Sequence, residues 1–247
     1  MLNLIEKFKK NISNILYKDR FNLVEIDDFI DENLFTDLRN NFPNENFFSK
    51  HNDFAMSFTD DNEKFEKFIN ENENWKNLIK QFQNKNFVEY LMKFFGINNV
   101  YYKNSWKKFI PFFKESKLNF CFNISKNGGF SLPHTDSSRK LISLVFFFVD
   151  DNWSINDGGF VNLYKPNDEK YENNWRNQRI DPENLTVINT IIPKKNKIYG
   201  FKKTKNSYHS VEKVMSENTN LRKVLMINLV YANKEDSPYK EKKFLFF

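Results

Sequence analysis

The residue pattern changes near residue 100, and this change limits the folds that the chain can adopt. Before it, apolar residues recur at helical spacing, whereas after it short apolar or alternating stretches are separated by turn residues. Residues 118–125 alternate most cleanly, with Phe120, Phe122 and Ile124 on one side and polar residues on the other. A helical part followed by a strand-rich part predicts an α+β fold.

The strand-rich part, about 100–235, is expected to form a double-stranded β-helix, or jelly roll. Its run at 141–149 is almost wholly apolar, as expected of a strand that is buried on both faces. Several short strands with turn signals between them are typical of a double-sheet jelly roll. The predicted strands cover residues 118–125, 141–149, 159–164, 185–192, 197–201 and 224–231.

The first part of the chain, about 1–99, is expected to be mainly helical and to pack on one outer face of the jelly roll. The polar segment 44–62 is predicted to be a long loop. A strand at 21–26 is expected to join the sheet, so we expect residues 1–247 to form a single domain. Helices are predicted over 1–19, over 31–42 and, two or three times, over 63–95.

Composition restricts the compartment and the partners. The single cysteine, Cys121, excludes an intramolecular disulfide and a multi-cysteine zinc site, which fits a reducing compartment. No apolar run approaches the ~20 residues of a membrane helix, and residues 1–10 lack a signal-peptide core. The net charge of +6 comes from lysines scattered among acidic residues, which favours a solvated surface over a nucleic-acid site. We therefore expect a cytoplasmic protein with neither a membrane nor a nucleic-acid partner.

Potential metal ligands occur after the first glycine pair, at 128–129. His134 and Asp136 are separated by one residue, so on an extended segment both side chains point to the same side. Such a pair occurs by chance in many sequences, and its two side chains then usually lie on the solvent-exposed surface. With His209 it supplies two imidazoles and one carboxylate, the ligand set of non-haem Fe(II) oxygenases. The remaining histidine, His51, lies in the predicted 44–62 loop, either on the surface or in a lid over the site.

Arg222 is a candidate for binding an anion. On the strand that follows it, its side chain lies on the same side as Val224, Met226 and Asn228, in a stretch expected to be buried. A buried guanidinium needs an anionic partner. That partner is either an Asp or Glu of the protein or a substrate carboxylate held by two parallel hydrogen bonds.

Several segments together resemble one family, the iron(II)- and 2-oxoglutarate-dependent oxygenases, in their prolyl-hydroxylase-like branch. Residues 21–29 resemble the first strand and helix of that family, and 129–136 resemble its first metal motif. Residues 140–160, with the glycine pair at 158–159, resemble the middle strands. Pro193 to Phe201, His209-Ser210-Val211 and Arg222 resemble the end of the core. The resemblance covers about 21–232 and is strongest over 128–231.

The resemblance implies a site and a reaction. His134, Asp136 and His209 would hold Fe(II), and Arg222 would pair with the distal carboxylate of 2-oxoglutarate. Dioxygen would be the oxidant, with ascorbate as a further candidate cofactor, and succinate and carbon dioxide would be released as a C–H bond is hydroxylated. Where relatives often carry a tyrosine that contacts 2-oxoglutarate, this chain offers Asn123 and Ser125, which weakens the case for a peptidyl-proline substrate.

We therefore expect a hydroxylase acting on a small metabolite, such as an amino acid or a sugar derivative, or on a protein side chain. Substrate choice is expected to lie in 44–62, 97–116 and 165–183. Arg139 and Lys140 could meet an anionic substrate, solvent or a carboxylate of the protein. The alternatives are a jelly-roll module that binds metal or ligand without catalysis and a nucleic-acid demethylase. No oligomeric state is predicted.

Overall fold

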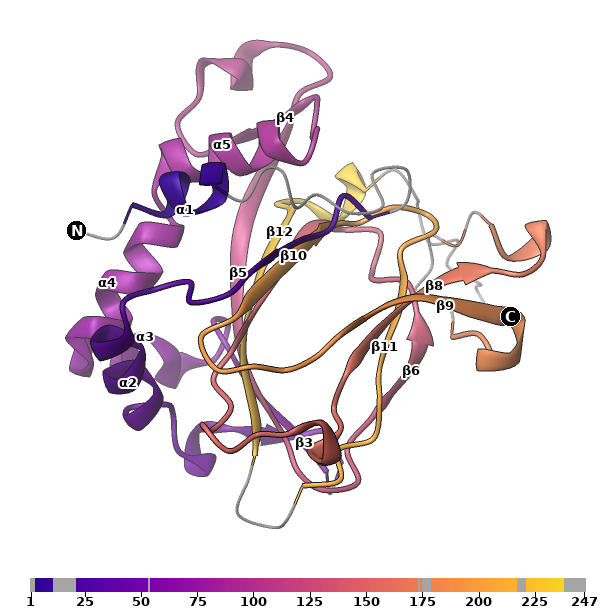
Figure 1. The fold of residues 1–247 in the computed structure, drawn as a ribbon. Helices are drawn as coiled ribbons and strands as arrows, with labels where there is room; N and C mark the ends of the chain where they lie inside the picture. The colour runs from indigo at the N-terminus through magenta and orange to yellow at the C-terminus, as the bar shows by residue number, and fades with distance from the viewer. Residues whose placement is uncertain are drawn as a thin grey trace, which may run out of the picture.

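Two β-sheets face each other, and the helices cover the outer face of the larger one (Figure 1). The computed structural model describes residues 3–10, 21–52, 54–172, 174, 179–216 and 221–237. The helices are α1 (Leu4–Lys10), α2 (Glu32–Asn40), α3 (Glu63–Glu71), α4 (Glu73–Phe82) and α5 (Lys85–Phe94). Within these described ranges, every helix is too short or too polar to cross a bilayer.

The larger sheet has eight strands in the order β1-β10-β7-β12-β5-β3-β2, with β4 paired in parallel to β5. Its centre is formed by β12, which pairs antiparallel with β5 on one side and β7 on the other. The strands are β1 (Val24–Ile26), β2 (Ser49–Lys50), β3 (Ala55–Thr59), β4 (Val100–Tyr102), β5 (Lys114–Ser125), β7 (Lys140–Phe147), β10 (Ile198–Lys202) and β12 (Arg222–Tyr231).

The smaller sheet has four strands in the order β6-β11-β8-β9, and all its pairings are antiparallel. Its strands are β6 (Ser131–His134), β8 (Val161–Pro166), β9 (Leu185–Ile191) and β11 (Tyr208–Val211). From β5 to β12 the chain passes back and forth between the two sheets, with β8 and β9 as neighbours in the smaller one, as in a double-stranded β-helix. The predicted α+β jelly roll with helices on one face is therefore confirmed.

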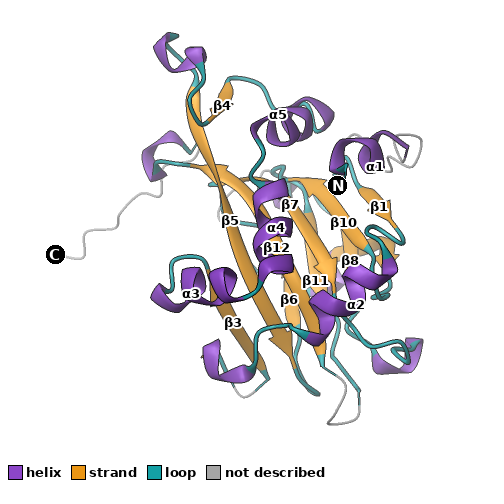
Figure 2. Cartoon of the chain, turned by 90° about the vertical axis from the view of Figure 1, so that its left-hand side faces the viewer, coloured by secondary structure: helices purple, strands orange, loops and turns teal. Residues whose placement is uncertain are grey.

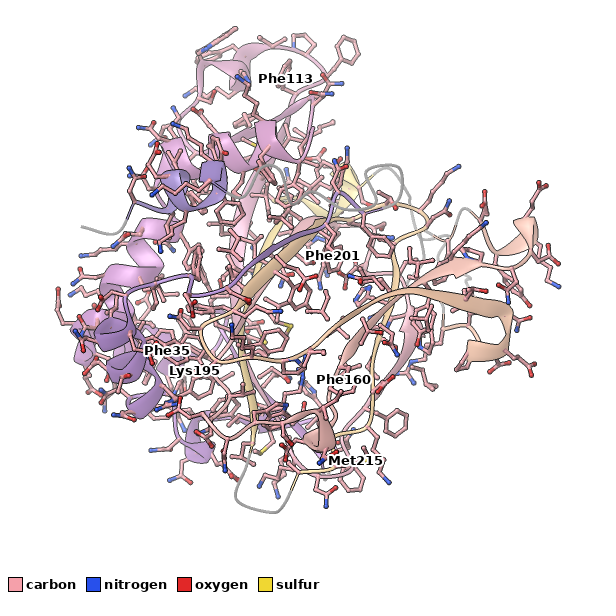
Figure 3. The ribbon with its side chains drawn as sticks, in the orientation of Figure 1. Phe35, Phe113, Phe160, Lys195, Phe201 and Met215 are labelled. Carbon is pink, nitrogen blue, oxygen red and sulfur yellow. The ribbon has the colours of Figure 1, made fainter. Side chains whose placement is uncertain are left out.

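The larger sheet is buried on both faces, and each face contributes to a different core. Toward the helices, Phe122 of β5 packs edge-on against Trp75 of α4, with ring centroids 4.8 Å apart. Figure 2 shows the helices gathered over this face. Toward the smaller sheet, Phe147 and Phe201 pack against Leu163 of β8, and Figure 3 places Phe201 in the molecular interior. The first layer fixes the helices, and the second encloses the space between the sheets.

The predicted helix boundaries are largely confirmed. Asp31 caps α2 because its carboxylate accepts hydrogen bonds from the backbone nitrogens of Asn33 and Leu34. Gly96 follows α5 with a φ of +61°, the left-handed conformation that ends helices at glycine. The predicted helix over 1–19 corresponds to α1, and residues 11–20 lie outside the described part. The strand expected at 21–26 joins the sheet as β1, beside β10.

The prediction of one continuous loop over 44–62 is wrong. This segment contains β2 and β3, and β3 pairs along its length with the end of β5. The strand β3 alternates, with Met56 and Phe58 buried in the core and Ala55, Ser57 and Thr59 on the other face, but this signal is only two apolar residues long within a polar segment. The strands β6 and β11 were not predicted as strands because each is only four residues long and mixes polar with apolar residues.

Candidate active site

Three side chains converge in the space between the sheets. His134 ends β6 and His209 lies on β11, and the two are direct partners in the strand pairing, with ring centroids 4.5 Å apart. Asp136 follows two residues after His134 and is buried. One ligand atom of each residue lies within 4.8 Å of the others, which is close enough for the three to hold one metal ion.

Each imidazole is held by its Nδ1 atom. The Nδ1 of His134 lies 2.8 Å from the carbonyl oxygen of Leu132, and the Nδ1 of His209 lies 3.1 Å from that of Ser207. Because a carbonyl only accepts hydrogen bonds, both Nδ1 atoms carry a proton, which leaves Nε2 as the metal-binding atom of each ring. Burial lowers the pKa of His209 to about 4, so its ring is neutral at pH 7.

The carboxylate of Asp136 is held on both oxygens. Its Oδ1 lies 2.7 Å from the ammonium of Lys140, and its Oδ2 accepts a hydrogen bond of 3.0 Å from Ser143. Burial alone would raise the pKa of Asp136, but the Lys140 ammonium, through its charge and its hydrogen bond, holds that pKa well below its usual range. Asp136 is therefore ionised at neutral pH.

These observations test whether the site suits ferrous iron. Two imidazoles that are hydrogen-bonded through Nδ1, together with one ionised carboxylate, match the donor set that Fe(II) takes with open positions. Each donor is also oriented by a second hydrogen bond, as metal ligands usually are. The residues present therefore fit Fe(II).

The three side chains line a cavity of about 270 Å³ between the two sheets. Its floor comes from β5, β7, β10 and β12 of the larger sheet, and its opposite wall from β6 and β11. The lining residues are Ala55, Asn123, Ser125, Phe130, Ser131, His134, Asp136, Lys140, Ser143, Val145, Tyr199, Phe201, His209, Val211, Arg222, Val224, Met226 and Asn228.

Arg222 enters this cavity without a carboxylate partner. Its side chain is 4% exposed, its Nε donates to the carbonyl oxygen of Gly159 at 2.8 Å, and its guanidinium lies 5.2 Å from the ring centroid of Phe147. Burial lowers its pKa, and no Asp or Glu in the described ranges forms an ion pair with it. The interpretation of Arg222 as half of an intraprotein salt bridge is thus not supported.

The remaining predicted residues divide between the cavity and the surface. Asn123 and Ser125 line the cavity, and Ser125 faces Arg222 across the β5–β12 pairing. Arg139 instead donates to the carbonyl oxygens of Tyr231 and Ala232 outside the cavity. His51 is exposed and hydrogen-bonded to Ser57 at 2.6 Å, which supports the surface interpretation over the lid.

Sequence reasoning missed three polar residues of the cavity. Tyr199 and Ser143 lie in stretches that were assigned to the apolar core. Asn228 was placed on the correct face of its strand but given no role, although its Oδ1 is buried without a hydrogen-bond partner. The signal for all three was their alternation with core residues on β10, β7 and β12.

Comparison with protein families identifies the central part of the chain. Residues 121–224 match the model of the 2OG-Fe(II) oxygenase superfamily, a segment that contains all three candidate metal ligands and Arg222. The sequence matches no functionally curated protein.

Solved structures with this fold include a prolyl 4-hydroxylase from Phytophthora capsici, at 16% identity and a TM-score of 0.56, covering 97% of this chain and 69% of that one. A Trichoplax adhaerens prolyl hydroxylase in complex with a hypoxia inducible factor peptide is similar at 11% identity and a TM-score of 0.56. The match covers 94% of this chain and 92% of that one. HygX from Streptomyces hygroscopicus, with nickel and 2-oxoglutarate bound, is similar at 9% identity and a TM-score of 0.53. The match covers 92% of this chain and 87% of that one. At these identities the likeness concerns the fold.

The matched segment, the jelly-roll fold and the His-Asp-His cluster agree with one another. Over residues 121–224, which include the three candidate metal ligands, the chain is similar to the 2OG-Fe(II) oxygenase superfamily, whose members use Fe(II), 2-oxoglutarate and dioxygen.

Proposed function

We propose that this protein is an Fe(II)- and 2-oxoglutarate-dependent dioxygenase that hydroxylates a C–H bond of a small metabolite or a protein side chain. The observation that carries the proposal is that one cavity brings together the His134-Asp136-His209 cluster and Arg222, which forms no ion pair with a carboxylate among the described residues. In this proposal the three clustered residues hold Fe(II). Arg222 holds the distal carboxylate of 2-oxoglutarate through two parallel hydrogen bonds.

Bound iron and 2-oxoglutarate supply the oxidising chemistry, and the protein supplies geometry and a dry site. Lys140 and Ser143 fix the Asp136 carboxylate, while Leu132 and Ser207 fix the two imidazoles. The Arg222 guanidinium is aimed by Gly159 and by the Phe147 ring. Asn123, Ser125 and Tyr199 are the further polar groups that we assign to 2-oxoglutarate, since all three line the cavity.

We also propose that residues 1–247 act as one catalytic domain. Support comes from the N-terminal strand β1, which is hydrogen-bonded to β10 in the same sheet that forms the cavity floor. The helices are attached to that sheet through a shared aromatic core, so the helical and β-rich parts have no separate interiors.

The charge of the loaded cavity favours an anionic substrate. Among the described lining residues the fixed charges are one carboxylate, on Asp136, and two cations, Lys140 and Arg222. Ferrous iron and the 2-oxoglutarate dianion cancel one another, so one positive charge remains in a buried space. A substrate carboxylate near Lys140 would neutralise it. The unpartnered Oδ1 of Asn228 would accept a hydrogen bond from a substrate amine or hydroxyl.

Replacing Lys140 should therefore affect the primary substrate. Because a hydrogen bond to a charged group contributes about 1.5–3 kcal/mol, Lys140→Gln should raise the KM of an anionic substrate by roughly ten- to hundredfold. Lys140→Arg, which keeps the charge, should lie between this variant and the unmodified enzyme. Steady-state kinetics with the identified substrate measures the effect. A neutral or cationic best substrate with an unchanged KM in Lys140→Gln would contradict the assignment.

Gly159 allows a test of how Arg222 is aimed. A Cβ atom at this position would lie 2.8 Å from Cδ of Arg222, and the residue has a φ of +68°. Gly159→Ala should lower the affinity for 2-oxoglutarate, measured by calorimetry, as well as the melting temperature. Gly96→Ala is the matched control, since Gly96 has a φ of +61° but a Cβ atom there would meet only Nζ of Lys202, at an ordinary contact distance of 3.9 Å. The control should lower only the melting temperature, and equal losses of affinity in both variants would refute the idea.

The overall function is tested by assaying succinate formation from 2-oxoglutarate over a library of metabolites and peptides, with Fe(II) and ascorbate present. Mass spectrometry should find one product that has gained a single oxygen atom. A binding module without catalysis would bind 2-oxoglutarate but form no succinate with any compound. A nucleic-acid demethylase would respond only to methylated oligonucleotides, which belong in the same library.

A further inference from the structure

A projecting loop between β4 and β5 has no role in the proposed reaction. We call residues 103–113 the aromatic knob. It lies at one end of the molecule, where Figure 1 shows the chain extending beyond α5, and Figure 3 places its Phe113 at the opposite end from Met215. None of its residues lines the cavity. Whatever the knob contacts, that contact is separate from the catalytic site.

The knob exposes aromatic rings to an unusual degree. Trp106, Phe109 and Phe112 are 69%, 78% and 87% exposed, and they are the three most exposed large apolar side chains of the described residues. Large apolar side chains gathered on a soluble surface mark an interaction site. Here they stand on a convex projection rather than in a groove, so their partner must accept protruding rings.

Basic side chains accompany these rings. Lys103, Lys107 and Lys108 belong to the knob, and no acidic residue occurs between positions 103 and 114. The ammonium of Lys108 lies 4.8 Å from the ring centroid of Phe109, and that of Lys107 lies 5.3 Å from that of Phe113. Among the described residues, none of the three knob lysines forms an ion pair. The surface is therefore both apolar and positively charged.

Local hydrogen bonds shape the start of the knob. Ser105 is buried and caps a short 3₁₀ turn over Trp106–Phe109 by accepting from the backbone nitrogen of Lys107. Phe112 has a φ of +77°, a left-handed conformation that is unfavourable for a non-glycine residue. A bulky residue kept in such a conformation, with its ring in solvent, is a common sign of function.

We propose that the aromatic knob binds the surface of an anionic lipid bilayer. Tryptophan and phenylalanine are favoured at the interface between headgroups and acyl chains, and lysines beside them pair with lipid phosphates and carboxylates. The expectation of no membrane partner rested on the lack of a spanning segment, and a surface contact needs none. A single-stranded nucleic acid would instead require a groove that follows its backbone, which a convex projection does not provide.

The test is co-sedimentation of the full chain with vesicles. The protein should bind vesicles of equal parts phosphatidylcholine and phosphatidylserine, and bind phosphatidylcholine vesicles far more weakly. The triple variant Lys103→Gln, Lys107→Gln, Lys108→Gln should bind the anionic vesicles about 100-fold more weakly, because each lysine near such a surface adds roughly a factor of five. The triple variant Trp106→Ser, Phe109→Ser, Phe112→Ser should lose at least about tenfold.

Matched controls distinguish binding through the knob from binding that depends only on net charge or on exposed apolar side chains elsewhere. Lys64→Gln, Lys67→Gln, Lys80→Gln removes the same charge from exposed positions on α3 and α4, and Ile155→Ser, Val187→Ser, Ile192→Ser removes exposed apolar side chains elsewhere. Both control variants should bind vesicles like the unmodified protein. Equal binding to both vesicle types, loss of binding in either control, or no binding at all would overturn the proposal. So would knob-dependent self-association or oligonucleotide binding without vesicle binding.

Discussion

Asp136→Ala should abolish both metal binding and turnover. The unmodified chain, purified without oxygen, is expected to bind about one Fe(II), since two imidazoles and a carboxylate are the usual protein ligands of such iron. Removing the carboxylate leaves two neutral ligands and no negative charge to offset the ion. It also leaves the Lys140 ammonium, now 2.7 Å from Asp136, without its partner. Iron stoichiometry and succinate formation measure the two losses.

A second variant distinguishes loss of the Asp136 metal ligand from loss of the folded structure. Asp136→Asn keeps the shape and a hydrogen-bond acceptor for Ser143, so its melting temperature should stay close to that of the unmodified chain while iron binding fails. Asp168→Ala removes an exposed carboxylate outside the cavity and should change neither quantity. Full iron occupancy and normal turnover in Asp136→Ala would show that the metal ligands have been misassigned.

Arg222→Ala should selectively weaken the binding of 2-oxoglutarate. Truncating one partner of a buried, hydrogen-bonded charge pair costs ~2–5 kcal/mol, which corresponds to roughly 30- to 5000-fold in affinity. Arg222→Lys should give an intermediate loss, since an ammonium keeps the charge but cannot present two parallel donors. Calorimetric titration with 2-oxoglutarate gives the affinities, and Fe(II) binding should change much less.

Lys223 is the matched control for Arg222. It is the next residue on β12 and points to the opposite face, where its ammonium lies 5.9 Å from the ring centroid of Phe42. Lys223→Ala should leave the affinity for 2-oxoglutarate unchanged. If Arg222→Ala instead lowers the melting temperature while 2-oxoglutarate still binds normally, the arginine supports the fold and does not hold the cosubstrate.

The sequence predicted strand faces and side-chain directions best where the alternation of residues had a single cause, the burial of one face of a strand. The alternation over 118–125 identified both faces of β5, because a strand between two cores must put Phe120, Phe122 and Ile124 against the helices. The position of Arg222 followed from the same alternation on β12. Spacing also placed His134 and Asp136 on one side of an extended segment, and the structure brings them to His209.

The rest of the site depended on pairings between distant segments. No local pattern indicates that His134 and His209 are partners on neighbouring strands, since that register is set by the sheet as a whole. Lys140 and Ser143 lie at the start of an apolar stretch, and their role became visible only when both met the Asp136 carboxylate. The strand β3 offers only Met56 and Phe58 as a local signal, and its place beside β5 is set by the sheet.

The position of β6 has a consequence for the lifetime of the protein. It is the outer strand of the four-stranded sheet and only four residues long, with Phe130 and Leu132 exposed. Its outer edge is only partly covered: the backbone nitrogen of Ile180 donates to the carbonyl oxygen of Pro133 at 3.0 Å, and Arg179 forms an isolated bridge with His134. Open edges with apolar side chains invite strands of other molecules to add, which leads to aggregation. An ion shared by His134 and His209 would tie this edge to β11, and binding to the folded state alone shifts the folding equilibrium by mass action. The cellular supply of ferrous iron would then determine how long the chain survives as well as how fast it works.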